Sequence, residues 1–85
     1  MNKSIRLTAH AAEYKLKRGF TDAEVVDAIK TSSWQPAELN RLQCEKNFEF
    51  KSEWNDVYFQ TKQIKPIFVD EANEIVVITV YTYYF

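Results

Sequence analysis

The chain has 85 residues, of which 46% are hydrophobic and 15% aromatic, and its formal net charge at pH 7 is −1. A chain of this length forms a single domain, 1–85, and buries only about 60–65% of its unfolded surface, so its core is small. The apolar content excludes an intrinsically disordered chain, and the near-neutral charge excludes attraction to nucleic acid through overall charge.

The charges are nevertheless distributed unevenly along the chain. Residues 3–18 hold five basic side chains and one acidic side chain, a local charge of +4, whereas the remainder holds six basic and eleven acidic ones. The basic residues of this block are Lys3, Arg6, Lys15, Lys17 and Arg18. Such a block predicts either a basic binding face or an ordinary solvated helix face.

Cysteine usage and hydropathy predict the compartment. Cys44 is the only cysteine, which excludes an intramolecular disulfide and favours reducing conditions. The first residues lack an apolar signal segment, and the longest apolar run, 75–85, is too short to cross a bilayer as a helix. We therefore expect a soluble cytoplasmic protein with no membrane partner.

The first expected helix begins at Thr8, whose hydroxyl can cap the free amides of the first turn, and ends at Gly19, which suits a left-handed final position. The cations in its last turn, where the helix dipole favours positive charge, are Lys15, Lys17 and Arg18. The residues expected to face the sheet are Ala9, Ala12 and Leu16.

A second helix is expected after a two-residue joint at 19–20. The sequence TDAE at 21–24 is a capping box, in which Thr21 caps the helix start and Glu24 reaches back to it. The apolar face of this helix is provided by Val25, Val26 and Ile29. The helix should end near residue 31 or 32, and the short joint predicts a tight αα-hairpin.

Beyond residue 40 the hydrophobic pattern changes to a period of two, which is typical of strands. The first strand is expected within 44–51, and EWND at 53–56 predicts a turn. Residues 57–69 predict one long strand or two short ones. Pro66 lacks an amide hydrogen, so this strand should lie at an edge or be bulged there.

A further turn, DEAN at 70–73, precedes the apolar run 75–85, whose near-continuous hydrophobicity favours a central strand with both faces covered. The expected fold class is α+β, with an N-terminal αα-hairpin packed on an antiparallel sheet of three to four strands.

The order and spacing of several short motifs resemble those of a known family. The motif residues are His10, Arg18, Gly19, Phe20, Thr79, Val80 and Tyr81. Over nearly its whole length the chain resembles the domain of unknown function family 4258, and its ending KPIFVDEANEIVVITVYTYYF is similar to cyanobacterial members. Four residues after the histidine, where that family usually has arginine, this chain has Tyr14.

The resemblance implies a fold and a function. The family's two helices followed by an antiparallel sheet resemble the RelE- and BrnT-like toxins, which are small ribonucleases neutralised by an antitoxin. What the resemblance implies here is a RelE-like fold, a toxin-type ribonuclease, and two partners: RNA and a cognate antitoxin protein.

Metal-free RNA cleavage needs a base for the 2′-hydroxyl proton, a cation for the phosphate and an acid for the leaving oxygen. Histidine changes its protonation near neutral pH, and the fork of arginine grips phosphate oxygens in pairs. On an ideal helix His10, Tyr14 and Arg18 span an arc of about 80° and a rise of about 12 Å, so they form one stripe.

These residue types lead to specific expectations. His10 is expected to be the acid or base and Arg18 to hold the phosphate. Tyr81 or Tyr83 is expected to supply the complementary proton donor. The candidate RNA-binding residues are Tyr14, Lys15, Lys17, Lys62 and Lys65.

Each candidate also has a structural interpretation. A lone histidine near a helix start can be a hydrogen-bonded structural group, and Arg18 can interact with the helix C-terminus or pair with Glu13. Tyr14 can serve packing alone, lysines on an edge strand can prevent aggregation, and the aromatic residues at 81–85 can belong to the core or to an interface.

Other chemistry has little support in the sequence. One histidine and no cysteine pair argue against a zinc site, and a single glycine excludes a Gly-rich phosphate loop. No metal or other cofactor is expected. The alternative function is a non-catalytic protein-interaction module, or a decayed toxin, that uses the aromatic C-terminal strand, with a second copy of the chain as one partner.

Overall fold

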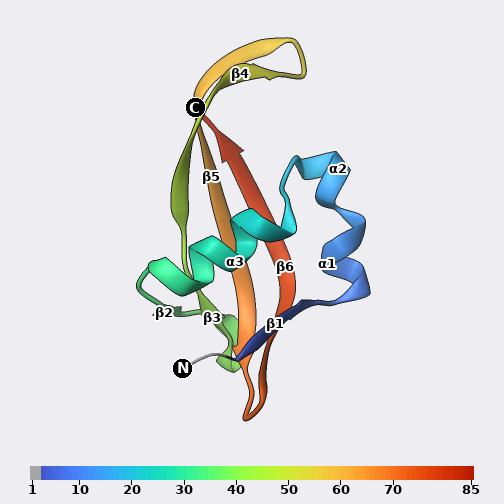
Figure 1. Cartoon of the computed structure of the whole chain (residues 1–85), viewed down its shortest axis with the longest axis vertical. Coiled ribbons are helices and arrows are strands. Elements are labelled where there is room, and N and C mark those ends of the chain that lie inside the picture. Colours follow the sequence, from blue (N-terminus) through green and yellow to red (C-terminus); the bar gives the residue numbers. More distant parts are fainter. Residues whose placement is uncertain (1–2) are drawn as a thin grey trace.

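The structure, a computed structural model, describes residues 3–85. Within this range three α-helices and one 3₁₀ turn accompany a six-stranded sheet (Figure 1). The elements in chain order are β1 Ser4–Leu7, α1 Ala9–Glu13, α2 Lys15–Arg18, α3 Asp22–Thr31, β2 Gln35–Pro36, η1 Glu38–Asn40, β3 Leu42–Gln43, β4 Lys46–Trp54, β5 Val57–Asp70 and β6 Glu74–Tyr84. None of the helices between residues 3 and 85 is long and apolar enough to cross a membrane.

The sheet is mixed and larger than expected. Its strand order is β1-β6-β5-β3-β2, and β4 also pairs with β5. β1 runs parallel to β6, while every other pairing is antiparallel. The α+β class is confirmed, whereas an antiparallel sheet of three to four strands is wrong. The sequence did not predict β1 because only Ile5 and Leu7 alternate inward there, which is too short a pattern to detect.

The first helical segment begins and ends where predicted, but it is broken. Thr8 accepts a hydrogen bond from the amide of Ala11, and Gly19 closes the segment with a φ of 77°. Between them Tyr14 has φ −94° and ψ 5°, so the helix divides into α1 and α2. The break changes the inward face: Ala11 is buried, whereas Leu16 is 93% exposed, and the expectation that Leu16 faces the sheet is wrong.

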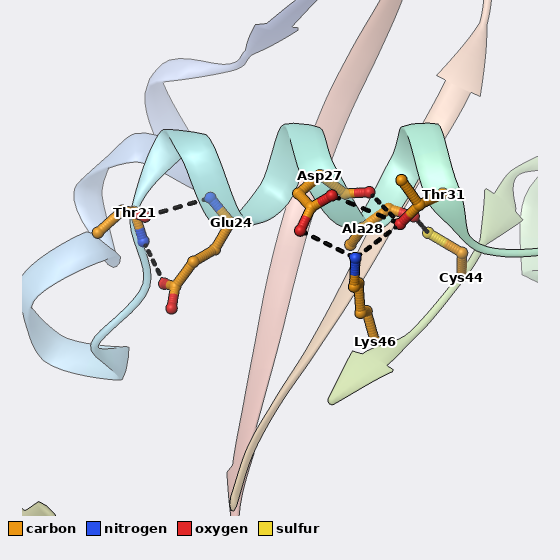
Figure 2. Close-up of polar contacts among 7 residues, drawn as sticks. All are labelled: Thr21, Glu24, Asp27, Ala28, Thr31, Cys44 and Lys46. Carbon is orange, nitrogen blue, oxygen red and sulfur yellow. Dashed lines mark hydrogen bonds and ion pairs between the residues drawn. The ribbon is translucent and has the colours of Figure 1, made fainter. Parts of the chain in front are cut away.

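The capping box of α3 is confirmed. Thr21 Oγ1 accepts from the amide of Glu24 at 3.2 Å, and a Glu24 carboxylate oxygen accepts from the amide of Thr21 at 2.9 Å (Figure 2). Farther along, Lys46 Nζ donates to Asp27 and to Thr31 at 2.9 Å each, which ties α3 to β4. These contacts fix the direction of α3 across the sheet.

The helices, α1 and α2 on one side of the joint at 19–20 and α3 on the other, are held mainly by the sheet. α3 crosses β5, while α1 and α2 lie beside β6 (Figure 1). The short joint is therefore present, but each segment packs on its own strand, and the expected αα-hairpin is matched only loosely. The buried residues that join helices and sheet are Ala11, Phe20, Val25, Ala28, Ile29, Cys44, Ile64, Phe68, Ile75, Val77 and Val80.

The β4–β5 hairpin has the predicted turn. Asn55 and Asp56 have φ values of 51° and 67°, which suits a two-residue turn between antiparallel strands, because both central residues need positive φ. This hairpin lies at the end of the sheet where the chain ends (Figure 1), and its Trp54 reaches back to Gly19 at the end of α2. β5 then continues as one long strand to Asp70.

Pro66 lies in the central strand, so the edge position is wrong, although a bulge follows it between Ile67 and Phe68. Thr61 and Phe85 exchange hydrogen bonds of 2.8 and 3.0 Å. Because such pairs alternate along an antiparallel ladder, Pro66 opposite Val80 is a non-hydrogen-bonded pair. The missing amide hydrogen therefore breaks no bond to β6.

β6 lies between β1 and β5, as predicted for a central strand. Its first half is covered on both faces, with Ile75, Val76 and Val77 buried. Its second half is not, because Tyr81 and Tyr83 are 42% and 46% exposed on the face opposite the helices. Coverage of both faces is therefore confirmed only for the first half.

Candidate functional site

Four of the predicted residues form a continuous contact chain, which we call the Arg18 stripe: His10, Tyr14, Arg18 and Tyr81. The rings of His10 and Tyr14 meet edge to face with centroids 5.2 Å apart. The guanidinium carbon of Arg18 lies 4.2 Å from the Tyr14 ring centroid and 5.4 Å from that of Tyr81. The stripe survives the helix break because Tyr14 itself is the residue at the break.

Arg18 is held in place by the edge of β6. Its Nη1 donates to the carbonyl of Val80 at 2.8 Å and to Thr79 Oγ1 at 3.4 Å. β1 pairs with β6 only as far as Val77, so Arg18 satisfies a carbonyl that β1 leaves unpaired. Neither structural interpretation of Arg18, a contact with the helix C-terminus or a pair with Glu13, occurs. Its Nε and Nη2 groups have no acceptor among residues 3–85.

His10 lies on the outer side of α1. The residue is exposed, and among residues 3–85 its ring makes no hydrogen bond, so it is not a buried structural group. Water and a ligand can both reach the imidazole. Tyr14 next to it is half-buried and packs against the core.

Tyr81 and Tyr83 line a hollow on the outer face of the sheet, which we call the sheet-face pocket. Its volume is about 570 Å³. Lys65 of β5 and Arg41 also line it, and the loop 36–41 forms its far wall. Tyr81 belongs to both the pocket and the Arg18 stripe, so the two features are continuous.

The remaining predicted lysines lie in different settings. Lys62 is only 8% exposed and lies on the helix side of β5, where its Nζ donates to the carbonyl of Gly19 at 2.9 Å and pairs with Glu24 at 2.8 Å. It is not on an edge, and its ammonium group is already occupied by Gly19 and Glu24. Lys15 pairs with Asp22 at 2.7 Å, whereas Lys17 is exposed, 5.7 Å from the Tyr14 ring.

The basic N-terminal block is largely neutralised by carboxylates from elsewhere. Lys3 pairs with Asp70 at 2.6 Å, and Arg6 pairs with Glu74 at 3.1 Å. The Arg6 guanidinium holds the pKa of the Glu74 carboxyl below its usual value through a hydrogen bond. With Lys15 also paired, Lys17 and Arg18 are the members of the block that form no ion pair within residues 3–85.

An aromatic cluster supports Arg18 from behind. The hydroxyl of Tyr84 donates to the Arg18 carbonyl at 3.0 Å, and its ring stacks on Trp54 with centroids 4.9 Å apart. Burial raises the pKa of Tyr84 to about 12, and the nearby Glu24 carboxylate acts in the same direction. A Cβ on Gly19 would lie 2.7 Å from the Trp54 indole, so glycine is required there for space as well as for its positive φ.

Sequence reasoning missed Arg41 and the loop that carries it. Leu39 and Asn40 both have a φ of 59°, a left-handed conformation that is uncommon for leucine, whereas asparagine adopts it more readily. The loop reaches the pocket because β2 pairs with β3, and β3 pairs with β5. Strands of two residues, such as β2 and β3, are too short to leave a hydrophobic pattern in the sequence. The local signals of a turn in this region are Pro36 and Asn40.

No family model, curated protein or solved structure matches the chain. The resemblance to family 4258 and to RelE-like toxins therefore stays a prediction. Among residues 3–85 no three histidine, cysteine, aspartate or glutamate side chains gather as metal ligands would. The site has to be interpreted from its own geometry.

Proposed function

We propose that the chain is a metal-independent endoribonuclease of the toxin–antitoxin type, neutralised by a cognate antitoxin. The observation that supports this most is the state of Arg18. Its Nη1 is fixed on β6, while the Nε and Nη2 edge, which suits two phosphate oxygens, has no protein acceptor among the described residues. An accessible imidazole lies one aromatic ring away.

The proposed reaction uses the RNA 2′-hydroxyl as nucleophile. His10 takes the proton of that hydroxyl, whose oxygen attacks the adjacent phosphorus, and Arg18 binds the non-bridging oxygens as charge develops on them. The hydroxyl of Tyr81 donates its proton to the departing 5′-oxygen. The products are a 2′,3′-cyclic phosphate and a 5′-hydroxyl, and solvent returns the protons. Tyr81 is favoured over Tyr83 because its ring contacts Arg18.

The test is cleavage of a 5′-labelled single-stranded RNA by purified protein in EDTA. We expect His10→Ala to slow cleavage at least about 100-fold, the scale of a lost general base. Arg18→Lys keeps the charge but loses the fork, so we expect about 10-fold slower cleavage or more. Tyr58→Phe is the control, because Tyr58 is an exposed tyrosine of the β4–β5 hairpin that belongs to neither the Arg18 stripe nor the sheet-face pocket.

The outcome that would overturn the proposal is the same rate and fragment pattern for wild type and His10→Ala, which would identify a contaminating nuclease. The toxin–antitoxin assignment has its own test. Expression of the chain alone should arrest growth, and co-expression of the adjacent reading frame should relieve the arrest.

A second candidate function is a non-catalytic protein-interaction module. It is favoured by the exposed apolar residues of the β4–β5 hairpin and chain end, where Val57, Tyr58 and Phe85 are 53%, 57% and 57% exposed. In that case expression would not arrest growth. Light scattering would detect a dimer if the partner is a second copy.

A further inference from the structure

The sheet-face pocket has the size and lining of a ligand site. Its volume of about 570 Å³ falls in the range of small-molecule pockets. Two tyrosines from β6, Tyr81 and Tyr83, lie on one side, with their rings on the open face of the sheet. Such rings can stack on any nucleobase, because every base has a π-face.

Cations line the same pocket. Neither Arg41 nor Lys65 forms an ion pair within residues 3–85, and Glu38 is the one acidic residue among the described residues that line the pocket. The chain carries −1 overall, and most cations of its N-terminal block are neutralised. Two unpaired cations beside two tyrosines are therefore the feature of this surface most suited to an anionic, ring-bearing ligand.

The wall of the pocket is held in an unusual conformation. Leu39 and Asn40 both have positive φ, and hydrogen bonds between Ala37, Glu38 and Arg41 close the loop on itself. Strained backbone of this kind persists where the surroundings determine it, and it is concentrated at ligand sites. The loop thereby positions Arg41 opposite the strand that carries Lys65.

We infer that the sheet-face pocket binds one unpaired nucleotide of a single-stranded RNA, next to the phosphate held by Arg18. Its base stacks on Tyr83 and its phosphate contacts Lys65 and Arg41. This inference rests on the proposed function and names its substrate class. The two subsites adjoin because Tyr81 lines the pocket and also contacts Arg18. A duplex is excluded as substrate because its bases are already stacked on one another.

The test measures binding separately from cleavage. The probe is a fluorescein-labelled 2′-O-methyl RNA of about 12 nucleotides, a length that covers one small domain. Its blocked 2′-oxygens prevent the cleavage reaction. Fluorescence anisotropy gives Kd at several salt concentrations. We expect the single strand to bind at least about 10-fold more tightly than the duplex of the same sequence.

Matched variants separate stacking from charge. Tyr83→Ala should weaken binding about 10-fold without changing its salt dependence, while Tyr83→Phe should stay within about twofold of wild type. Lys65→Ala should reduce the slope of log Kd against log salt by about 0.7, the value for one phosphate contact on a single strand. Tyr58→Ala and Lys30→Ala, both exposed and outside the pocket, are the controls.

The inference is overturned if Tyr83→Ala binds as tightly as wild type, if the duplex binds as well as the single strand, or if wild type binds neither. Circular dichroism of each variant excludes misfolding. Its failure is distinguishable from that of the proposed function. Cleavage that needs His10 but not Tyr83 contradicts only the pocket, whereas Tyr83-dependent binding without His10-dependent cleavage contradicts only the nuclease.

Discussion

At the scale of single residues, Arg18 combines a structural bond through Nη1 with an Nε and Nη2 edge that has no acceptor among residues 3–85. One nitrogen satisfies the Val80 carbonyl, while the aromatic rings of Tyr14 and Tyr81 lie close to its guanidinium carbon. A lysine ammonium could donate to the carbonyl and to one phosphate oxygen, but it has no planar fork that holds two phosphate oxygens side by side. Under the proposed function, Arg18 is therefore positioned before a phosphate arrives, which lowers the entropic cost of binding.

Tyr84 provides a residue-scale prediction about pH. Its pKa is raised to about 12 from an ordinary value of 10.0, chiefly by burial, so the folded state retains the phenolic proton more tightly than the unfolded state. The resulting stability is fully present below pH 10 and is lost as the pH rises from about 10 to 12. Tyr84→Phe should be less stable than wild type by about 1 kcal/mol at pH 8, because it loses one hydrogen bond.

The measurement for Tyr84 is urea unfolding of wild type and Tyr84→Phe between pH 8 and pH 11. The difference in the free energy of unfolding should narrow as the pH rises. The other tyrosines and the lysines contribute equally to the pH dependence of both proteins, so their contributions cancel in the difference. A difference that is constant over this range would show that Tyr84 does not titrate with a raised pKa.

At the scale of elements, the junction between α2 and α3 depends on one lysine. Lys62 from β5 donates to the Gly19 carbonyl at the end of α2 and pairs with Glu24 in the first turn of α3. Glu24 is also the capping-box carboxylate. One ion pair therefore connects the end of one helix, the start of the next and the central strand.

This junction predicts strong coupling between two side chains. Lys62→Met should lower the free energy of unfolding by about 2–3 kcal/mol, because it leaves a largely buried carboxylate without its cation. Glu24→Gln keeps a capping acceptor but removes the charge, and the double variant should be less destabilised than the sum of the two. Urea unfolding of all four proteins measures the coupling. Additive effects would mean that the pair contributes nothing as a pair.

The elements also show which parts of the fold can be predicted from sequence. Thr8, Gly19, the capping box at 21–24 and the turn at 55–56 act within a few residues, so their local signals were sufficient. The pairing of β1 with β6 joins residues about 70 positions apart, and loop closure over that length leaves no local trace. The break at Tyr14 could not be predicted either, because no proline or glycine lies at that position.

The candidate site divides in the same way. His10, Tyr14 and Arg18 could be grouped from helical spacing, and Tyr81 from its place on the last strand. Arg41 could not be found, because it reaches the pocket only through the pairing of β2, β3 and β5. Lys62 looked like a surface lysine of a strand, yet the helices cover it.

At the scale of the whole molecule, Cys44 reports whether helices and sheet separate together. The thiol is 2% exposed, its Sγ donates to the Ala28 carbonyl of α3 at 3.4 Å, and its amide donates to the Pro66 carbonyl of β5. Burial raises the pKa of this thiol to about 11 from 9.0, which further suppresses the reactive thiolate at neutral pH. A thiol reagent can therefore reach it only when the packing of α3, β5 and the segment around Cys44 opens.

If the small core unfolds as one unit, labelling of Cys44 by a disulfide reagent must follow global unfolding. A domain of this size has a free energy of unfolding of roughly 4–13 kcal/mol, so labelling should be slowed at least about 1,000-fold relative to the chain in urea. The free energy obtained from labelling rates at several low urea concentrations should equal that from equilibrium unfolding and have the same urea dependence. A lower value with a weak urea dependence would show instead that the packing around Cys44 opens locally while the rest of the domain stays folded. Agreement between the two values would establish that the two layers form one cooperative unit.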